Sequence, residues 1–321
     1  MSVPALAYLT SISRNFKAKT LTKGTINEIL SESDWKNAVN ILRERNYLEE
    51  TSDNFEEMEF IIKKNTIENL LQLGNLSMSV KTSHDIVNLY YYAVTLDEFE
   101  SLIASVENGV ELRSRFFPKI VDAKPTNVNE LLNVVRDTIH GKALQYALGK
   151  NPKNLSQLNS YLDYFFISEL TKITEGLRGD WKSFADGVLC GYKDYYTVSL
   201  ALRQKVQEEI HCKVSVDTIK DLVNARSNEE ALDTLRRLPY ARSMDFSNVY
   251  TALSTLHRVA RVQARNASLN AFMGSPFTPV TALAIAELLK LDMEDLITIL
   301  NGLKLGLPQE KIKAKLSLEL V

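Results

Sequence analysis

The segment from Thr278 to Leu316 constrains the fold most, because its apolar content is too high for a solvated helix. Capping and helix-ending residues divide it into three expected short helices. These residues are Thr278 and Pro279 at the first start, Asp292 and Asp295 at the second, Gly306 at its end, and Pro308 at the third start. We therefore expect three short helices here, packed against the rest of the protein.

The rest of the chain also favours helix. Only 12 glycines and 8 prolines occur in 321 residues, and no sustained alternation of apolar and polar residues predicts a strand. Apolar residues recur instead at helical spacing, as in Leu6, Leu9, Ile12 and Phe16. The sequence therefore predicts an all-α protein, and its length allows two or three domains.

Two features divide this helical chain into thirds. Pro118 and Pro125 interrupt the helical pattern and predict a loop or a domain joint. Asp85, Asp194 and Asp292 each precede an aliphatic residue in a similar context, at a spacing near a third of the chain. We expect three similar helical bundles at residues 1–118, 119–215 and 216–321, the first including the N-terminal helices.

Charge and composition narrow the partners and the compartment. The net charge of −2 gives no general attraction for nucleic acid or acidic lipid, so no nucleic-acid partner is expected. The longest apolar stretch, residues 280–286, is too short to span a membrane, and the N-terminus does not resemble a signal peptide. Cys190 and Cys212 have no motif spacing, which excludes a disulfide framework and fits a reducing compartment.

The known catalytic motifs are missing. His84, His140, His211 and His257 fit no zinc-binding spacing, and Gly149-Lys150 lacks the hydroxyl of a phosphate-binding loop. We therefore expect no catalytic, cofactor-binding or metal-binding residue.

A magnesium-dependent helical enzyme is the alternative that the carboxylates allow. Asp97, Glu98 and Glu100 come closest to the aspartate clusters of such enzymes, but they stand alone in the sequence. A solvated helix face is the simpler interpretation.

Arg258, Arg261 and Arg265 form the one charge feature with a candidate role. Their i, i+3, i+7 spacing places them on one helix face. Because guanidinium groups bind carboxylates in planar, bidentate contacts, the stripe is a candidate partner-binding surface. The alternative is a solvated face or a set of internal ion pairs.

The C-terminal segment resembles the end of the C subunit of archaeal-type (A-type/V-type) rotary ATPases, a family that includes the d subunit of the eukaryotic vacuolar ATPase. The resemblance rests on Leu283-Ala284-Ile285, Lys290, Asp292, Asp295-Leu296, Ile299, Gly302 and Gly306-Leu307-Pro308. The stretch from Leu155 to Arg203, with Tyr161 to Phe166 and Asp194, and the opening Ala7-Tyr8-Leu9 with Arg14 are similar too. Ile285 replaces an aromatic residue of the family, and Ile297 replaces an arginine.

This resemblance implies a fold and a function. It implies three similar helical bundles with a pseudo-threefold arrangement, forming a funnel. It implies a non-catalytic central-stalk subunit that couples the central shaft to the membrane proteolipid ring, for ATP-linked proton or sodium transport. It also implies a cytoplasmic protein held at the inner face of the membrane without a span of its own. An all-helical adaptor unrelated to rotary ATPases is the alternative.

Overall fold

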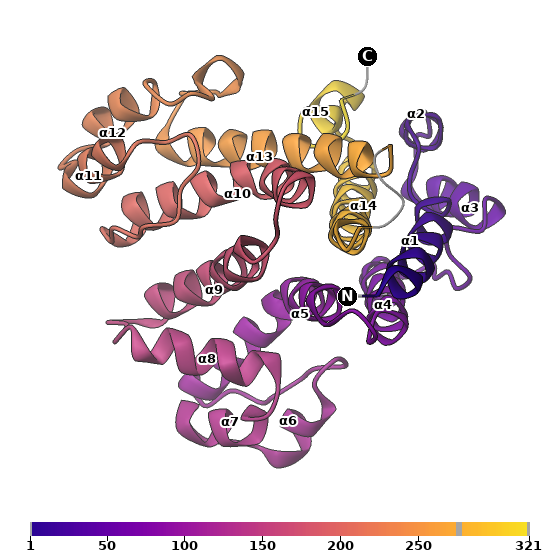
Figure 1. Cartoon of the computed structure of the whole chain (residues 1–321), viewed down its shortest axis with the longest axis horizontal. Coiled ribbons are helices and arrows are strands. Elements are labelled where there is room, and N and C mark those ends of the chain that lie inside the picture. The colour runs from indigo at the N-terminus through magenta and orange to yellow at the C-terminus, as the bar shows by residue number, and fades with distance from the viewer. Residues whose placement is uncertain (1, 274–277, 320–321) are drawn as a thin grey trace.

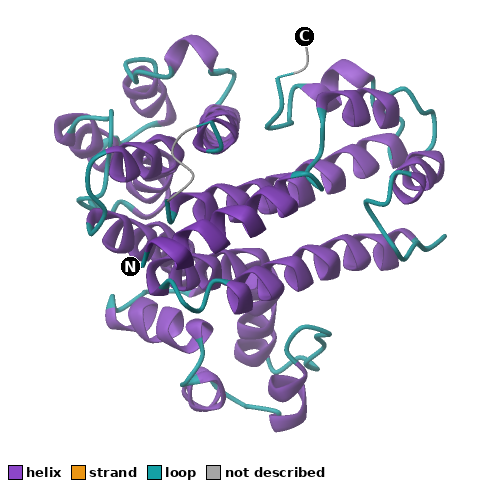
Figure 2. Ribbon diagram, turned by 45° about the vertical axis from the view of Figure 1, so that its right-hand side comes forward, coloured by secondary structure: helices purple, strands orange, loops and turns teal. Residues whose placement is uncertain are grey.

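The computed structural model describes residues 2–273 and 278–319, and within them every regular element is a helix (Figures 1 and 2). The all-α expectation is confirmed. The α-helices are α1 (Val3–Lys17), α2 (Lys23–Leu30), α3 (Trp35–Glu44), α4 (Phe55–Leu76), α5 (Lys81–Asn108), α6 (Pro118–Ala123), α7 (Val128–Val135), α8 (Ile139–Gly149), α9 (Leu155–Glu175), α10 (Asp180–Gln204), α11 (Val216–Asn224), α12 (Asn228–Leu235), α13 (Val249–Ala271), α14 (Val280–Lys304) and α15 (Gln309–Lys313), with a 3₁₀ turn at Ala241–Ser243. None of these helices is long and apolar enough to cross a bilayer.

One order of elements occurs three times. Two short helices precede two long ones in α2–α5, again in α7–α10, and again in α11–α14. The helix starts repeat as well. A side chain accepts a backbone N–H at the start of each first short helix (Thr22, Asn127, Ser215), each second short helix (Asp34, Thr138, Ser227) and each first long helix (Asn54, Asn154, Asn248). This recurrence is consistent with a pseudo-threefold arrangement, while the domain limits at residues 118 and 215 stay a prediction.

A carboxylate at an equivalent position on the second long helix of each unit aligns the three units with one another. Glu98 on α5 accepts the N–H groups of Arg115 and Phe116 at 3.1 and 3.4 Å. Asp194 on α10 accepts those of Cys212 and Lys213 at 2.7 and 2.9 Å. In each case the carboxylate holds the segment that follows its own helix.

The third carboxylate of this set is Asp295 on α14, which accepts the N–H of Ser317 at 3.0 Å. The alignment of Asp85, Asp194 and Asp292 expected from the sequence is therefore wrong for two of its three members. Asp85 forms an ion pair with Lys81 on the helix surface instead.

The six long helices form a closed circuit. Helix α4 packs on α5, α5 on α9, α9 on α10, α10 on α13, α13 on α14, and α14 on α4. Helix α14 also contacts α5 and α10 on one side and α1, α2 and α3 on the other. Because neighbours surround it, residues 280–293 of this helix are all buried.

The α4–α5 turn and the start of α14 lie at one end of the circuit. The Ser83 hydroxyl, just after the α4–α5 turn, donates to the carbonyl of Pro279 at 3.3 Å, which brings the turn at 77–80 next to the start of α14. Near the α9–α10 turn, the start of α10 packs on the end of α13, where Gly187 lies beside Ala267. The N-terminal ends of α4 and α13 therefore lie at the other end of the molecule.

The C-terminal segment differs from the expectation of three short helices. Helix α14 runs unbroken from Val280 to Lys304, so the predicted helix start at Asp292 is wrong. No breaker precedes Gly302, and burial on both sides favours a continuous helix over a local cap. Thr278 lies one residue before the N-cap, Pro279, although its hydroxyl accepts the N–H of Val280. The predictions for the other two residues hold: Gly306 has a φ of 63° and ends α14, and Pro308 precedes α15.

The two cysteines form a disulfide that joins α10 to the segment after it. The expectation that excluded a disulfide is therefore wrong, because the segment after α10 folds back on that helix and brings the two Cα atoms to 5.2 Å. The reducing compartment inferred with it stays a prediction. A single cross-link between residues 190 and 212 closes a loop whose backbone Asp194 also holds, and Cys212 lies exposed at the surface.

The contact between α10 and α13 depends on a glycine, which gives a stability test. A Cβ atom on Gly191 would lie 2.8 Å from the Cα of Ala260, whereas one on Gly187 would meet only the Ala267 Cβ at 3.5 Å. We expect Gly191→Ala to lower the free energy of unfolding by about 1–3 kcal/mol through overpacking. Gly187→Ala, on the same helix, should raise it by about 0.5–1 kcal/mol through helix propensity. Urea unfolding of both variants checks this, and equal effects would contradict the close approach.

Candidate functional site

A hollow of about 760 Å³ lies at the end of the long helices away from their turns. It is bordered by the N-terminal parts of α4 and α13 and the C-terminal halves of α5 and α14. Its lining includes Glu56, Glu59, Phe60, Lys63, Ala93, Asp97, Glu98, His257, Arg261, Glu294, Ile297 and Thr298. Four of the six long helices thus contribute to one concave surface.

The charges in this hollow are mostly acidic. Lys63 pairs with Asp97 across α4 and α5. Glu59 accepts the side-chain N–H of Asn301 at 2.7 Å, which ties α4 to α14. Burial lowers the pKa of His257 to about 3, so this histidine is neutral at physiological pH. With its lysine and arginine each next to a carboxylate, the hollow keeps a net negative charge.

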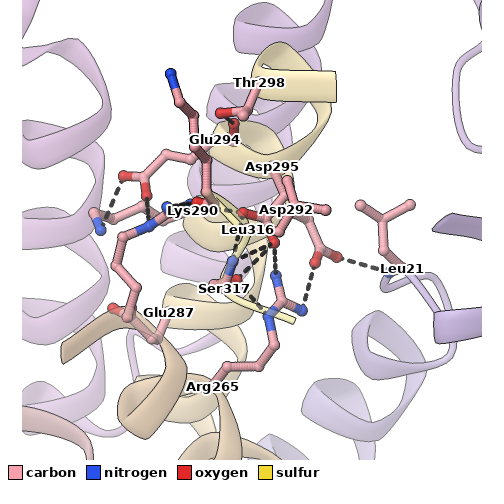
Figure 3. A network of polar contacts seen from close by, with 12 residues as sticks. Leu21, Arg265, Glu287, Lys290, Asp292, Glu294, Asp295, Thr298, Leu316 and Ser317 are labelled. Carbon is pink, nitrogen blue, oxygen red and sulfur yellow. Dashed lines mark hydrogen bonds and ion pairs between the residues drawn. The ribbon is translucent and has the colours of Figure 1, made fainter. Parts of the chain in front are cut away.

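Behind the hollow lies a buried network of charged side chains on α13 and α14 (Figure 3). Arg265, only 2% exposed, donates to Asp292 at 2.8 Å, to the Ser317 hydroxyl at 2.7 Å and to Asp295 at 3.3 Å. The second oxygen of Asp292 accepts the N–H of Leu21 at 2.8 Å. Burial raises the pKa of Asp292 to about 6, although Arg265 opposes the shift.

Arg261 extends the network toward the hollow. It donates to Asp295 at 2.7 Å and to the carbonyl of Lys315 at 3.0 Å, and its Nε lies 2.8 Å from Glu294. Lys290 pairs with the same Glu294 at 3.0 Å. Burial alone would raise the pKa of Glu294, but Lys290 and then Arg261 lower it to about 2.

A tyrosine joins this network to a third long helix. The hydroxyl of Tyr192 on α10 donates to Glu287 at 2.6 Å, and Lys290 lies 3.5 Å from the same hydroxyl. Glu287 and Tyr192 are almost fully buried. Polar contacts therefore connect α10, α13, α14, the N-terminal segment near Leu21 and the C-terminal residues around Ser317.

The three arginines of the predicted stripe lie along this network. Arg261 and Arg265 are buried, and their donors bind groups of the same chain. Arg258 is half-buried and donates from Nε to the carbonyl of Leu316 at 3.2 Å. Arg261 and Arg265 thus form the internal ion pairs considered from the sequence, and partner binding at the three residues stays a prediction.

The sequence interpretation missed the acidic partners of these arginines. Asp292, Glu294 and Asp295 stand in a mainly apolar segment with one lysine, Lys290, and buried carboxylates need cationic partners. That isolation was the available signal. From these carboxylates, ion pairs between the segment that forms α14 and the arginines at residues 261 and 265 could have been predicted. No feature of the sequence indicated the role of Ser317.

The carboxylates at residues 97–100 do not form a metal site in the described parts of the chain, where no group of three or more ligating His, Cys, Asp or Glu side chains occurs. Asp97 pairs with Lys63, and Glu98 holds the segment at 114–116. Glu100 has a buried oxygen without a hydrogen-bond partner. Burial, aided by Asp163 and Asp97, raises its pKa to about 8.

Arg265 gives the first test at this site. We expect Arg265→Met to lower the free energy of unfolding by about 3–5 kcal/mol, because it leaves Asp292 and Asp295 buried with fewer cationic partners. Arg258→Met is the matched control and should cost only about 1 kcal/mol, since it removes one bond to a carbonyl. Denaturant unfolding measures both values, and similar losses would argue against a network centred on Arg265.

Glu100 gives a test of pH dependence. Its pKa is higher in the folded protein, so the folded state binds more protons than the unfolded state between about pH 4.5 and 8, and stability falls as pH rises through this range. Glu100→Gln should remove this loss and exceed the wild type in stability at pH 8 by roughly 1 kcal/mol or more. Urea unfolding at pH 5 and pH 8 measures the difference, and a gap that does not widen toward pH 8 would contradict it.

Comparison with known proteins agrees with this architecture. No curated protein sequence gives a significant match to the chain. A family model described as the ATP synthase (C/AC39) subunit matches residues 9–315. That match covers nearly the whole chain, so the alternative of an adaptor unrelated to rotary ATPases is set aside. The chain belongs to the ATP synthase (C/AC39) subunit family of the V-type and A-type ATPases.

Proposed function

We propose that this chain is a non-catalytic central-stalk subunit that couples the central shaft of a rotary ATPase to its membrane proteolipid ring. It works in ATP-linked transport of protons or sodium ions. It has no active site or cofactor of its own and sits at the cytoplasmic face of the membrane through the complex.

The hollow between the long helices is the observation that carries this proposal. A subunit that passes torque from a shaft to a ring needs a concave surface that holds the shaft. The helices that form this surface have to be rigid. Four long helices border the hollow, and their contacts continue around a closed circuit. Close-packed protein interiors have low compressibility, so such a wall transmits force with little deformation.

The two ends of the circuit suit two different partners. The hollow would receive the tip of the shaft. The opposite end carries the α4–α5 turn and the end of α13, where Met78 and Met273 are exposed. Exposed apolar side chains on turns are suited to contact with a second protein surface, and we assign this end to the proteolipid ring.

The buried network supports the same proposal from inside the wall. Torque would tend to slide α13 against α14 and against the terminal segments. Ion pairs and hydrogen bonds are directional, so contacts such as Arg265 with Asp292 resist a shift in register that apolar packing alone would permit.

Recovery of partners from solubilised membranes tests the proposal. The tagged chain should bring down shaft subunits and proteolipid together, and it should show no hydrolase or transferase activity when pure. Recovery of neither partner, or an intrinsic activity, would overturn the proposal.

A variant in the hollow then locates the shaft contact. Thr298→Trp fills part of the hollow from a half-buried position on α14, and we expect it to weaken binding to purified shaft subunits at least tenfold, about 1.4 kcal/mol. Ser183→Trp, exposed on α10 and outside the lining, is the control and should bind as the wild type does. Equal affinities for the two variants would place the shaft elsewhere.

A further inference from the structure

A second and larger cavity of about 1130 Å³ lies on the outer side of α5 and α9, beneath α6, α7 and α8. It shares Phe116 with the hollow but is otherwise lined by different residues. Aromatic rings make up much of its wall, those of Tyr91, Phe116, Phe117, Tyr146 and Phe165. Leu71 and Val134 stand exposed at its edge, 48% and 38% accessible.

The cavity lies beside a packed core. In the third unit, where α11 and α12 cover α10 and α13, residues such as Ile219, Leu222, Leu235 and Leu253 form an apolar cluster. The second unit has the same order of short and long helices, and its Leu131, Val135 and Leu144 belong to the main apolar cluster of the protein. Because protein interiors are normally close-packed, a space of this size with an apolar lining is typical of a ligand site.

The charges at the edge of the cavity favour an anion. Lys81 pairs with Asp85 at 2.5 Å, and Glu169 pairs with Lys172, which lies outside the lining. Lys119 and Lys142 are exposed at the edge, opposed among the lining residues only by Asp137. Burial lowers the pKa of His140, at the cavity wall, to about 3, so its ring is neutral and adds no charge inside.

Of the uncharged polar side chains in the lining, Asn88 and Thr138 already form hydrogen bonds within the chain, while Gln145 stands exposed. The Nε2 of His140 is already bonded to the hydroxyl of Thr95 at 2.8 Å. Two lysines over an aromatic wall therefore match a molecule with one anionic end and an apolar body.

We propose that this cavity binds a single-chain anionic amphiphile, with its carboxylate on Lys119 and Lys142 and its hydrocarbon chain along the aromatic wall. The site opens on the outer side of α5 and α9 and shares only Phe116 with the hollow assigned to the shaft. An amphiphile bound there would contact α6–α8 and leave the hollow free. The occupancy of the site would depend on the concentration of free amphiphile near the membrane.

A chain-length series tests the apolar part of the site. Decanoate, laurate and myristate, each below its micelle concentration, are titrated into the full chain by calorimetry. Each added methylene should tighten binding roughly fourfold, the effect of burying one such group at about 0.8 kcal/mol. Affinities that do not depend on chain length, or no binding at all, would overturn the proposal.

Matched variants test the position and the head group. Val134→Trp fills the edge of the cavity and should abolish laurate binding, whereas Val110→Trp, exposed outside the lining, should not. The double change of Lys119 and Lys142 to Glu should weaken laurate at least tenfold and leave dodecanol unchanged. Lys153→Glu, exposed outside the lining, is the charge control. The assignment would be refuted if the wild type bound dodecanol as tightly as laurate. It would also be refuted if Val134→Trp bound laurate with unchanged affinity.

Discussion

The structure depends on the pairing of charges along one helix, α14, of which residues 280–293 are all buried. Neighbouring helices surround this part of α14, so Asp292 and, one turn on, Asp295 are shielded from water. Removing a carboxylate from water is costly, and the cost is offset only where a cation and further donors surround it. Arg261 and Arg265 supply those cations from α13, and Leu21 and Ser317 supply N–H groups from the two ends of the chain.

This pairing explains why the termini are fixed to the middle of the molecule. Apolar packing would allow the N-terminal and C-terminal segments several registers, since the hydrophobic effect has no direction. The two oxygens of Asp295 bind Ser317 and the arginines at once, which leaves one register. The same device, a carboxylate that holds the backbone after its own helix, occurs at Glu98 and Asp194 with different partners.

The sequence was sufficient for the features that local chemistry decides. Low glycine and proline content predicted the all-α fold, and Gly306 and Pro308 predicted helix limits that the structure has. It failed where tertiary contacts override local signals. Asp292 looks like a helix start, yet α14 continues through it because Arg265 and Leu21 occupy its carboxylate.

The candidate site was less accessible to sequence reasoning than the fold. The spacing of Arg258, Arg261 and Arg265 correctly predicted that they lie on one helix. Spacing alone cannot show whether the side chains on that face point to solvent or into the protein. The hollow and the outer cavity arise from residues far apart in the chain, such as Glu59 with Asn301, and no local pattern encodes such a meeting. For a coupling subunit of the proposed kind this is expected, since its function lies in the shape and stiffness of surfaces that distant segments build together. Catalytic motifs are short because few atoms take part in a reaction. A surface that binds a shaft is formed by residues of four helices, so it has no short sequence motif.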